Sequence, residues 1–142
     1  TEIYTLSLHD ALPISYELLL ARDPGNAAAA NNLAQVLLRQ NDERALPMAE
    51  RAVSLAPENP DALDTLGWLR ARSGALEGGL KALREARRRA PESRDIRYHL
   101  AWALHRSGQR DAARSELAAA LVGRGPFDSE AEARHLRREL GV

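Results

Sequence analysis

Three prolines, Pro24, Pro57 and Pro91, lie 33 and 34 residues apart, and the residue types between them recur in the same order. A fixed period of this length is typical of stacked two-helix units. A proline cannot continue the helix that precedes it, so each of the three marks the end of one unit. The sequence therefore predicts an all-α solenoid, a fold whose concave surface typically holds other molecules.

Small residues mark the positions where the predicted helices must cross. One set recurs in the first helix of each unit, each time after a leucine, and two sets recur in the second helices. The sets are Ala34, Gly67 and Ala101, then Ala45, Gly79 and Ala113, then Ala52, Ala86 and Ala120. Helix axes approach to about 8 Å only where the side chains at the crossing are small. We therefore expect these residues to be buried between helices.

Turn signals predict helices near residues 26–39, 43–55, 60–73, 76–89, 94–106 and 110–123. The two helices of each unit are separated by Asn41-Asp42, Ser73-Gly74 and Ser107-Gly108. Asparagine and glycine tolerate the left-handed conformation that ends a helix. Pro47 falls inside the second helix of the first unit, so we expect that helix to begin late or to bend.

The repeat resembles that of the tetratricopeptide family, whose consensus runs W-x2-L-G-x2-Y, then A-x3-F, then P. The second unit supplies Leu63, Leu66, Gly67 and Arg70, then Gly79, Leu83 and Pro91. The match is by residue class, because the consensus tryptophan and tyrosine are absent from their places. The resemblance implies repeats at residues 27–59, 60–93 and 94–127. It also implies a second-helix remnant of a truncated repeat at 15–26 and a capping helix at 128–142.

The first fourteen residues stand outside the repeat pattern and read TEIYTLSLHDALPI. They can be back-translated into a common sequencing-library adapter. We therefore expect residues 1–14 to be an assembly artefact and the natural protein to carry further repeats upstream. The alternative is a real amphipathic helix. At the other end, Ser129 with Glu132 predicts a capping box for a final helix whose apolar stripe is Ala133, Leu136 and Leu140.

Composition argues against several classes of function. The formal net charge is zero, which argues against bulk nucleic-acid binding, and no cysteine is present. No apolar run approaches the ~20 residues of a membrane helix, so we expect no membrane insertion by this segment. His99 and His105 are six residues apart on one predicted helix and diverge, which does not suit a shared metal. With no phosphate loop and no nucleophile motif, we expect no cofactor and no catalysis.

A basic cluster lies at one predicted helix end and consists of Lys81, Arg84, Arg87, Arg88 and Arg89. One interpretation is favourable charge at a helix C-terminus together with a solvated outer face. The other is an anion-binding patch. The balanced overall charge favours the first interpretation.

The first helices of the units offer the better candidate for a binding site. In a tetratricopeptide superhelix they line a concave groove, and inward positions recur once per unit. By analogy these positions are Asn31, Gln35 and Arg39, then Asp64, Trp68 and Arg72, then Tyr98, Trp102 and Arg106, with His105 nearby. Indole and guanidinium groups side by side suit extended peptides, carboxylate groups or sugar rings.

We expect Trp68 and Trp102 to stack as a ladder, and Arg39, Arg72 and Arg106 to form a second ladder one turn further along. Two alternatives stay open. The tryptophans can instead wedge against the next first helix or against the cap, since large aromatic side chains are mostly buried. The arginines can instead pair with Asp64 or Asp95.

Longer strings resemble one bacterial subfamily. They are NNLAQVLL at 31–38, ALPMAERAVSLAPENPDALDTLGW at 45–68, IRYHLAWALHRSG at 96–108 and ARSELAAAL at 113–121. These strings are similar to the C-terminal part of the PEP-CTERM system tetratricopeptide proteins, which are linked to exopolysaccharide production and exosortase sorting in Gram-negative bacteria. The resemblance implies a periplasmic, envelope-associated scaffold with a lipid anchor far upstream.

Three functional hypotheses follow. The first is a protein-interaction scaffold that holds a protein or peptide segment in the groove, and the second is polysaccharide binding through Trp68 and Trp102. The third is a structural cap of a longer solenoid that binds nothing. A peptide ligand should depend on the arginines and weaken with salt, whereas a glycan should depend on the tryptophans and be largely insensitive to salt.

Overall fold

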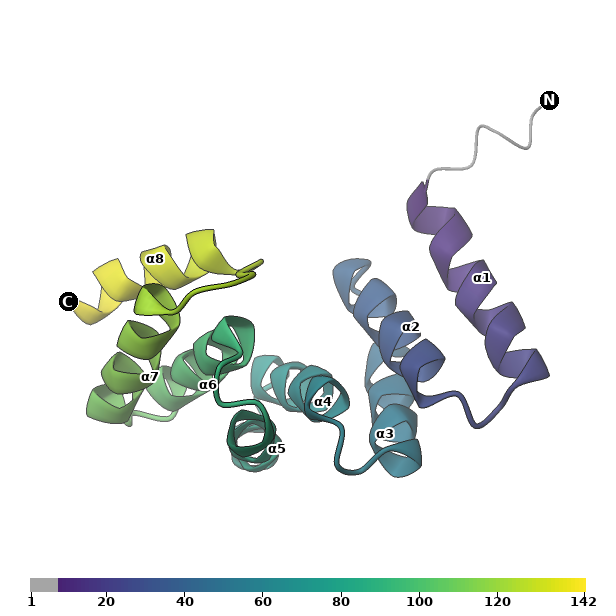
Figure 1. Ribbon diagram of the computed structural model, residues 1–142, viewed down its shortest axis with the longest axis horizontal. Helices are drawn as coiled ribbons and strands as arrows, with labels where there is room; N and C mark the ends of the chain where they lie inside the picture. The colour runs from purple at the N-terminus through teal and green to yellow at the C-terminus, as the bar shows by residue number, and fades with distance from the viewer. Residues whose placement is uncertain (1–7) are drawn as a thin grey trace.

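Eight α-helices make up the described part of the chain, which in this computed structural model is residues 8–142, with side chains from Pro13 onward. The helices are α1 Leu8–Arg22, α2 Ala27–Arg39, α3 Ala45–Leu55, α4 Pro60–Arg72, α5 Leu76–Arg89, α6 Arg94–Arg106, α7 Arg110–Val122 and α8 Glu130–Leu140. The hairpins α2/α3, α4/α5 and α6/α7 follow one another in a curved row (Figure 1). The predicted all-α solenoid is confirmed, and the six predicted repeat helices agree with the observed ones to within two residues.

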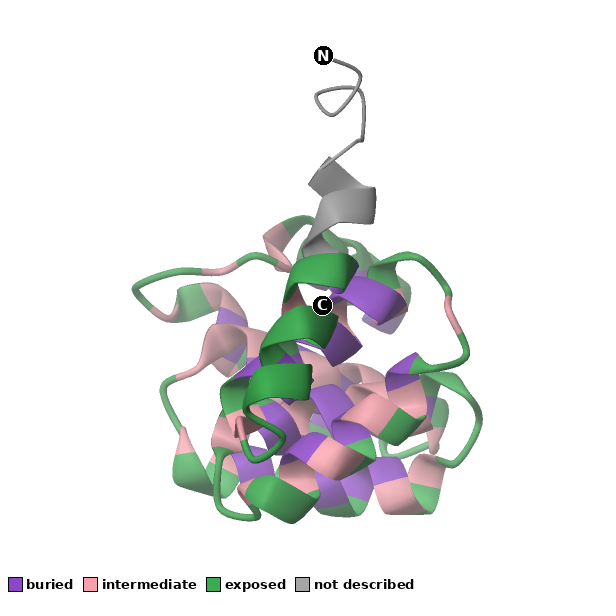
Figure 2. Cartoon of the chain, turned by 90° about the vertical axis from the view of Figure 1, so that its right-hand side faces the viewer, coloured by how far each residue is buried: buried purple, intermediate pink, exposed green. Residues whose placement is uncertain are grey.

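The small residues of the repeat are buried where helices cross, as the pattern predicts. The tightest crossing joins α4 and α5 at Gly67 and Gly79. A Cβ on Gly79 would lie 2.7 Å from the backbone nitrogen of Ala71 and 2.9 Å from the carbonyl oxygen of Gly67. Buried leucines, among them Leu83, fill the space beside the crossings. Figure 2 shows buried residues where helices face one another and exposed ones over the outer faces and loops.

The turns and helix starts use the residues that the sequence singles out. Asn41, Gly74 and Gly108 have φ angles of 54°, 95° and 83°, the left-handed conformation expected after a first helix. The side chains of Asn26 and Asn59 accept hydrogen bonds from backbone N–H groups at the starts of α2 and α4. These local bonds satisfy helix-end donors that would otherwise lack partners.

Helix α3 begins late, which confirms the expectation for Pro47. Its first residue is Ala45, so Pro47 lies in the first turn, where a missing N–H removes no intrahelical hydrogen bond. The preceding turn is closed by Asp42, whose carbonyl oxygen accepts from the Ala45 N–H at 3.1 Å. The Asp42 carboxylate also accepts from the Arg44 N–H at 2.9 Å.

The capping box predicted at Ser129 is wrong. Helix α8 begins at Glu130, and the Ser129 side chain makes no capping hydrogen bond. Instead, Asp95 of α6 accepts from the Ser129 N–H at 2.8 Å and from the Asp128 N–H at 3.2 Å. A carboxylate from the neighbouring repeat therefore binds the Ser129 N–H, which is the contact that the Glu132 carboxylate would make in a capping box.

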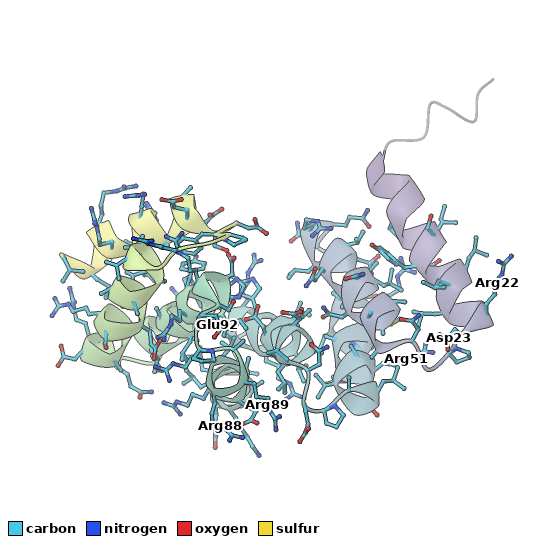
Figure 3. The ribbon with its side chains drawn as sticks, viewed as in Figure 1. Arg22, Asp23, Arg51, Arg88, Arg89 and Glu92 are labelled. Carbon is cyan, nitrogen blue, oxygen red and sulfur yellow. The ribbon has the colours of Figure 1, made fainter. Side chains whose placement is uncertain are left out.

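Helix α1 begins at Leu8 and includes Pro13, so it extends beyond the remnant expected from residue 15. Once a helix is nucleated, each added residue gains one hydrogen bond, which favours such an extension. Of the segment predicted to be an adapter artefact, residues 1–7 lie outside the described part, and that prediction remains a prediction. Arg51 of α3 secures the α1–α2 connection by donating to the Pro24 carbonyl oxygen at 2.8 Å (Figure 3). Within residues 8–142, no helix is both long enough and apolar enough to cross a membrane.

Candidate functional site: the concave groove

The first helices of the units, α2, α4 and α6, face the concave side of the row, and α8 lies across from α2 (Figure 1). Two cavities adjoin on this side, one of about 530 Å³ and one of about 460 Å³. Four residues line both cavities, namely Trp68, His99, Ser129 and Glu132. The two cavities therefore adjoin, and together we call them the groove.

Seven of the ten predicted groove residues line this space: Gln35, Arg39, Asp64, Trp68, Arg72, Tyr98 and Trp102. Arg106 lies at its edge, with its guanidinium carbon 5.4 Å from the centre of the Trp102 ring. The structure does not bring Asn31 or His105 to the groove. Asn31 is only 7% exposed and lines neither cavity. His105 is rotated by one residue from Arg106, which turns it off the inward face.

The aromatic side chains of the groove form one cluster. The Trp68 ring stacks on His99 with the centroids 4.3 Å apart and the planes at 23°. It meets Trp102 edge to face, at 5.0 Å and 73°, so the predicted ladder of stacked tryptophans is wrong in its geometry. The quadrupoles of two aromatic rings favour this edge-to-face contact, and His99 already covers one face of Trp68.

The alternative in which tryptophans wedge between helices is thus partly borne out. Trp68 packs on α6, and Trp102 borders a third cavity that is also lined by Leu136 of α8. Both tryptophans nevertheless remain partly exposed and reach the groove. Their indoles therefore join the repeats and also form part of the concave surface.

The predicted arginine ladder consists of the last residues of three successive first helices, Arg39, Arg72 and Arg106. All three side chains are exposed. Arg72 lies over the Trp68 ring at 5.7 Å, in the same way that Arg106 lies over Trp102. Such a contact is a cation–π interaction, which holds a guanidinium in place while its in-plane N–H groups stay free.

The alternative pairing of these arginines with Asp64 or Asp95 does not occur among the described residues. Asp64 instead accepts a hydrogen bond from His99, whose Nδ1 lies 2.8 Å and 3.0 Å from the two carboxylate oxygens of Asp64. The Asp95 carboxylate accepts hydrogen bonds from the backbone N–H groups of Asp128 and Ser129, which precede α8. Both carboxylates are therefore satisfied without the arginine ladder.

Tyr98 lies deeper than its neighbours and is only 6% exposed. Burial raises the pKa of the Tyr98 hydroxyl to about 12, and the negative charge of Glu132 adds to the increase while Arg72 opposes it. The phenol is therefore neutral over the whole physiological range. The Tyr98 ring packs against the Trp68 ring and forms part of the groove surface.

Sequence reasoning missed several groove residues. The sequence pattern does not predict His99 as a groove residue. It also does not predict that residues of the α7–α8 connection and of α8 line the groove. These are Asp128, Ser129 and Glu132, which line the larger cavity together with Asp61 and Asp95. The signal was present in part, since Asp61 and Asp95 recur one period apart at the starts of α4 and α6. The final helix carries no repeat signature that would have placed Glu132.

Three of the five cations in the basic cluster of α5 pair with neighbouring carboxylates. Arg88 pairs with Glu85 at 2.7 Å, Arg89 pairs with both Glu85 and Glu58, and Arg87 pairs with Glu116 at 3.1 Å. The hydrogen bonds from Arg88 and Arg89 lower the pKa of the Glu85 carboxyl below its usual value. Figure 3 shows Arg88 and Arg89 on the outer side of the row, away from the concave side. The geometry thus supports the interpretation as a solvated outer face.

The fold and the groove together define a class of protein, an α-solenoid of helix-turn-helix repeats with a concave inner face. Residues 70–133 match the family model described as tetratricopeptide repeat. A curated relative, the TPR repeat-containing protein PA4667 of Pseudomonas aeruginosa, is 35% identical over 86 residues, which are 58% of this chain and 14% of the relative. The chain therefore spans a small part of that relative's length. These findings show that residues 70–133 are similar to tetratricopeptide repeats.

Solved structures with similar folds include two that are described as TPR proteins. TTC0263 of Thermus thermophilus has a TM-score of 0.76 and 24% identity, with 98% of this chain and 76% of that chain covered. YrrB, described as a TPR protein with an unusual peptide-binding site, has a TM-score of 0.71 and 22% identity, with 89% and 64% covered. MamA has a TM-score of 0.71 and 18% identity, with 96% and 90% covered. At these identities the likeness establishes the tetratricopeptide fold.

Proposed function

We propose that this chain is a protein-interaction scaffold that holds an extended segment of a partner protein in the groove. The observation that carries the proposal is the composition of the groove. Partly exposed indoles, arginines and carboxylates from four different helices line two adjoining cavities on the concave side. Tryptophan and arginine are the residues that most often anchor protein interfaces, because they combine a large contact area with directed hydrogen bonds. Proteins with this fold generally act as scaffolds rather than enzymes.

Polysaccharide binding is the second candidate, and it depends on open indole faces. One face of Trp68 is covered by His99, and the guanidinium groups of Arg72 and Arg106 lie over the rings of Trp68 and Trp102. A sugar ring needs a bare aromatic face for stacking, whereas a peptide can use the exposed edges and the arginines. The arrangement therefore favours a peptide over a glycan. In the third candidate, a purely structural cap, the groove has no ligand at all.

We further propose that the partner serves envelope or exopolysaccharide assembly and that the scaffold acts in the periplasm. This part rests on the strings at 31–38, 45–68, 96–108 and 113–121, which resemble the PEP-CTERM system tetratricopeptide proteins. The groove itself does not depend on that context. A peptide-binding scaffold of the same geometry would serve equally well in another assembly.

Selection from a displayed library of random peptides tests the scaffold proposal and does not require an identified partner. Glu132→Trp should block the groove, because Glu132 is exposed and lines both cavities. Glu77→Trp, at an exposed position of α5, is the matched control. We expect selected peptides to bind the parent chain and the control but not Glu132→Trp.

Two results would count against the scaffold. Peptides that bind Glu132→Trp as well as the parent chain would locate the binding surface outside the groove. A selection without any enriched peptide, combined with binding of a polysaccharide that high salt leaves unchanged, would favour the glycan candidate instead.

A further inference from the structure

We propose that the third cavity, a pocket between α6 and α8, takes a basic side chain of the segment that the groove holds. The pocket has a volume of about 360 Å³ and is lined by Tyr98 and Trp102 of α6 and by Glu132, His135, Leu136 and Glu139 of α8. Its residues Tyr98, Trp102 and Glu132 also line the smaller cavity of the groove, so a side chain of a bound segment can enter it. The inference rests on the proposed scaffold function and specifies one contact of the ligand.

The charge around the pocket is negative. Glu132 and Glu139 lie about two turns apart on α8, so both carboxylates are on the face that borders the pocket. Glu132 has no ion-pair partner within residues 13–142. Glu139 lies 3.2 Å from His135, and this contact is an ion pair only when the imidazole is protonated. Neither lysine nor arginine of the described chain lines the pocket to balance the two carboxylates.

The Tyr98 hydroxyl belongs to a buried side chain and has no partner of its own. Tyr98 is only 6% exposed, and its hydroxyl makes no hydrogen bond within residues 13–142. Burial raises the pKa of this hydroxyl, the charges of Glu132 and Glu139 add to the increase, and Arg72 opposes it, so both carboxylates act on the hydroxyl across the pocket. A bound ammonium or guanidinium group would donate to the hydroxyl oxygen and supply the hydrogen bond that it lacks.

The apolar walls of the pocket suit the stem of a long basic side chain. Lysine and arginine lay their methylene groups along apolar surface, here Trp102 and Leu136, and keep the charged head at polar partners. Arg106 already lies over the Trp102 ring, so the ring offers apolar contact and the carboxylates hold the charge. Within the residues that the structure describes, no three acidic or histidine side chains are placed to hold a metal ion. The pocket therefore fits an organic cation.

The larger cavity of the groove favours the same sign of charge in the ligand. Its lining contains one arginine, Arg39, and five carboxylates, which are Asp61, Asp64, Asp95, Asp128 and Glu132. Asp64 and Asp95 are hydrogen-bonded within the chain, whereas Asp61 and Asp128 form no ion pair within residues 13–142. A basic segment is therefore attracted along the path that leads to the pocket, and an acidic one is repelled.

Titrations with matched short peptides test the pocket. The probe is the blocked pentapeptide Ala-Pro-Arg-Pro-Ala, and its comparison peptide carries citrulline, which has nearly the shape of arginine but no charge. The nuclear magnetic resonance signal of the Trp102 indole N–H reports binding, and pH 8 keeps a protonated His135 from competing for Glu139. We expect the arginine peptide to bind at least about fivefold more tightly than the citrulline peptide, and this difference to shrink as salt rises.

Substitutions in the chain identify the contacts, and unchanged melting curves will show that the variants fold. Glu132→Gln and Glu139→Gln should each weaken the arginine peptide about two- to fivefold and change the citrulline peptide much less. Glu130→Gln is the matched control, because Glu130 also lies on α8 but pairs with Arg134 at 2.7 Å outside the pocket. Tyr98→Phe should weaken the arginine peptide roughly threefold, whereas a tyrosine that only packs would leave its affinity unchanged.

The possible failures can be told apart. Equal binding of the arginine and citrulline peptides, or Glu132→Gln and Glu139→Gln that bind as tightly as Glu130→Gln, would overturn the inference about the pocket. If library peptides without basic residues bind and Glu132→Trp blocks them, the scaffold function stands and only the basic contact is wrong. If neither the pentapeptide nor any library peptide binds, both proposals fail.

Free butylguanidinium tests the source of the cation. We expect it to bind more weakly than the arginine peptide, because the peptide also contacts the groove. Equal affinity of the two would assign the pocket to a free organic cation and overturn its assignment to a partner segment.

Discussion

Individual residues fix how closely the helices approach one another. Gly67 and Gly79 face each other across the α4–α5 crossing, and Gly78 next to them points elsewhere. A Cβ on Gly78 would meet only the flexible Arg70 side chain, at 3.5 Å. Two adjacent glycines of one helix thus have different structural roles, one required by the crossing and one dispensable.

The substitutions Gly79→Ala and Gly78→Ala should change stability in opposite directions. The new methyl group at position 79 meets backbone atoms that cannot move aside, so we expect a loss of about 1–3 kcal/mol in the free energy of unfolding. The methyl group at position 78 has room and removes the conformational cost of a helical glycine, which should add about 0.5 kcal/mol. Urea unfolding measures both, and a stable Gly79→Ala would contradict the close crossing.

The buried hydroxyl of Tyr98 makes stability depend on high pH. Its pKa is raised from about 10 to about 12, so the unfolded chain loses the proton first. The contribution to stability is complete below about pH 10 and is lost as the pH rises through about 12. Ultraviolet titration should show one late tyrosine that is absent from Tyr98→Phe. A chain in which all tyrosines titrate together near their ordinary pKa would contradict the burial of this side chain.

At the level of elements, the helices differ in which group accepts the hydrogen bonds of their first backbone N–H donors. Repeats two and three begin with local caps at Asn59 and Ser93. Helix α8 lacks such a cap and is held at its start by Asp95 of α6. The attachment of the last helix therefore depends on the preceding repeat.

Asp95→Ala and Ser129→Ala should separate the two kinds of capping. Removing the Asp95 carboxylate leaves two backbone N–H groups without their acceptor, and we expect a loss of about 0.5–2 kcal/mol. The Ser129 side chain makes no capping bond, so its removal should cost little. Hydrogen exchange of the α8 amides provides the readout. A larger effect of Ser129→Ala would restore the capping box that the sequence suggested.

Most of the elements could be predicted because they depend on residues close together in sequence. The turn glycines, the asparagine caps and the small residues at the crossings all recur with the repeat, and each acts within its own unit. The cap on α8 could not be predicted in the same way, since Asp95 lies in an earlier helix, far in sequence from the backbone groups that it binds. The edge-to-face contact of Trp68 with Trp102 also escaped prediction, because His99 from the next repeat covers one face of Trp68.

As a whole molecule, the chain is a row of repeats in which each unit contacts its immediate neighbours. The buried side chains accordingly group into clusters, with Leu33 in one that runs from α1 to α4 and Leu136 in another that runs from α4 to α8. Stability in such a row is approximately the sum of the units and the interfaces between them. A destabilising substitution at one end should therefore lower the local stability mainly of the helices at that end.

Leu33→Ala and Leu136→Ala test this independence. Both leucines are fully buried, so each substitution should cost about 2–5 kcal/mol. We expect faster hydrogen exchange in α1–α3 for the first variant and in α6–α8 for the second. Uniformly faster exchange along the chain in either variant would show a single cooperative unit instead of a row of coupled repeats.

The positions of the groove residues could be predicted in part from the repeat alone. Successive first helices present corresponding positions to the same side, which is why Gln35, Trp68 and Trp102 all reach the concave surface. Which charges remain free could not be predicted, since pairing depends on neighbours from other helices. Asp64, for example, is hydrogen-bonded to His99 of the next repeat.

Both tryptophans of the chain line the groove, so the nuclear magnetic resonance signals of their indole N–H groups give the most direct test of where a partner binds. The measurement is a titration of the isotope-labelled chain with a library-selected peptide. We expect the signals of Trp68 and Trp102 to shift together with amides of α2, α4 and α6. Unmoved indole signals, with shifts confined to α3, α5 and α7, would contradict binding on the concave side.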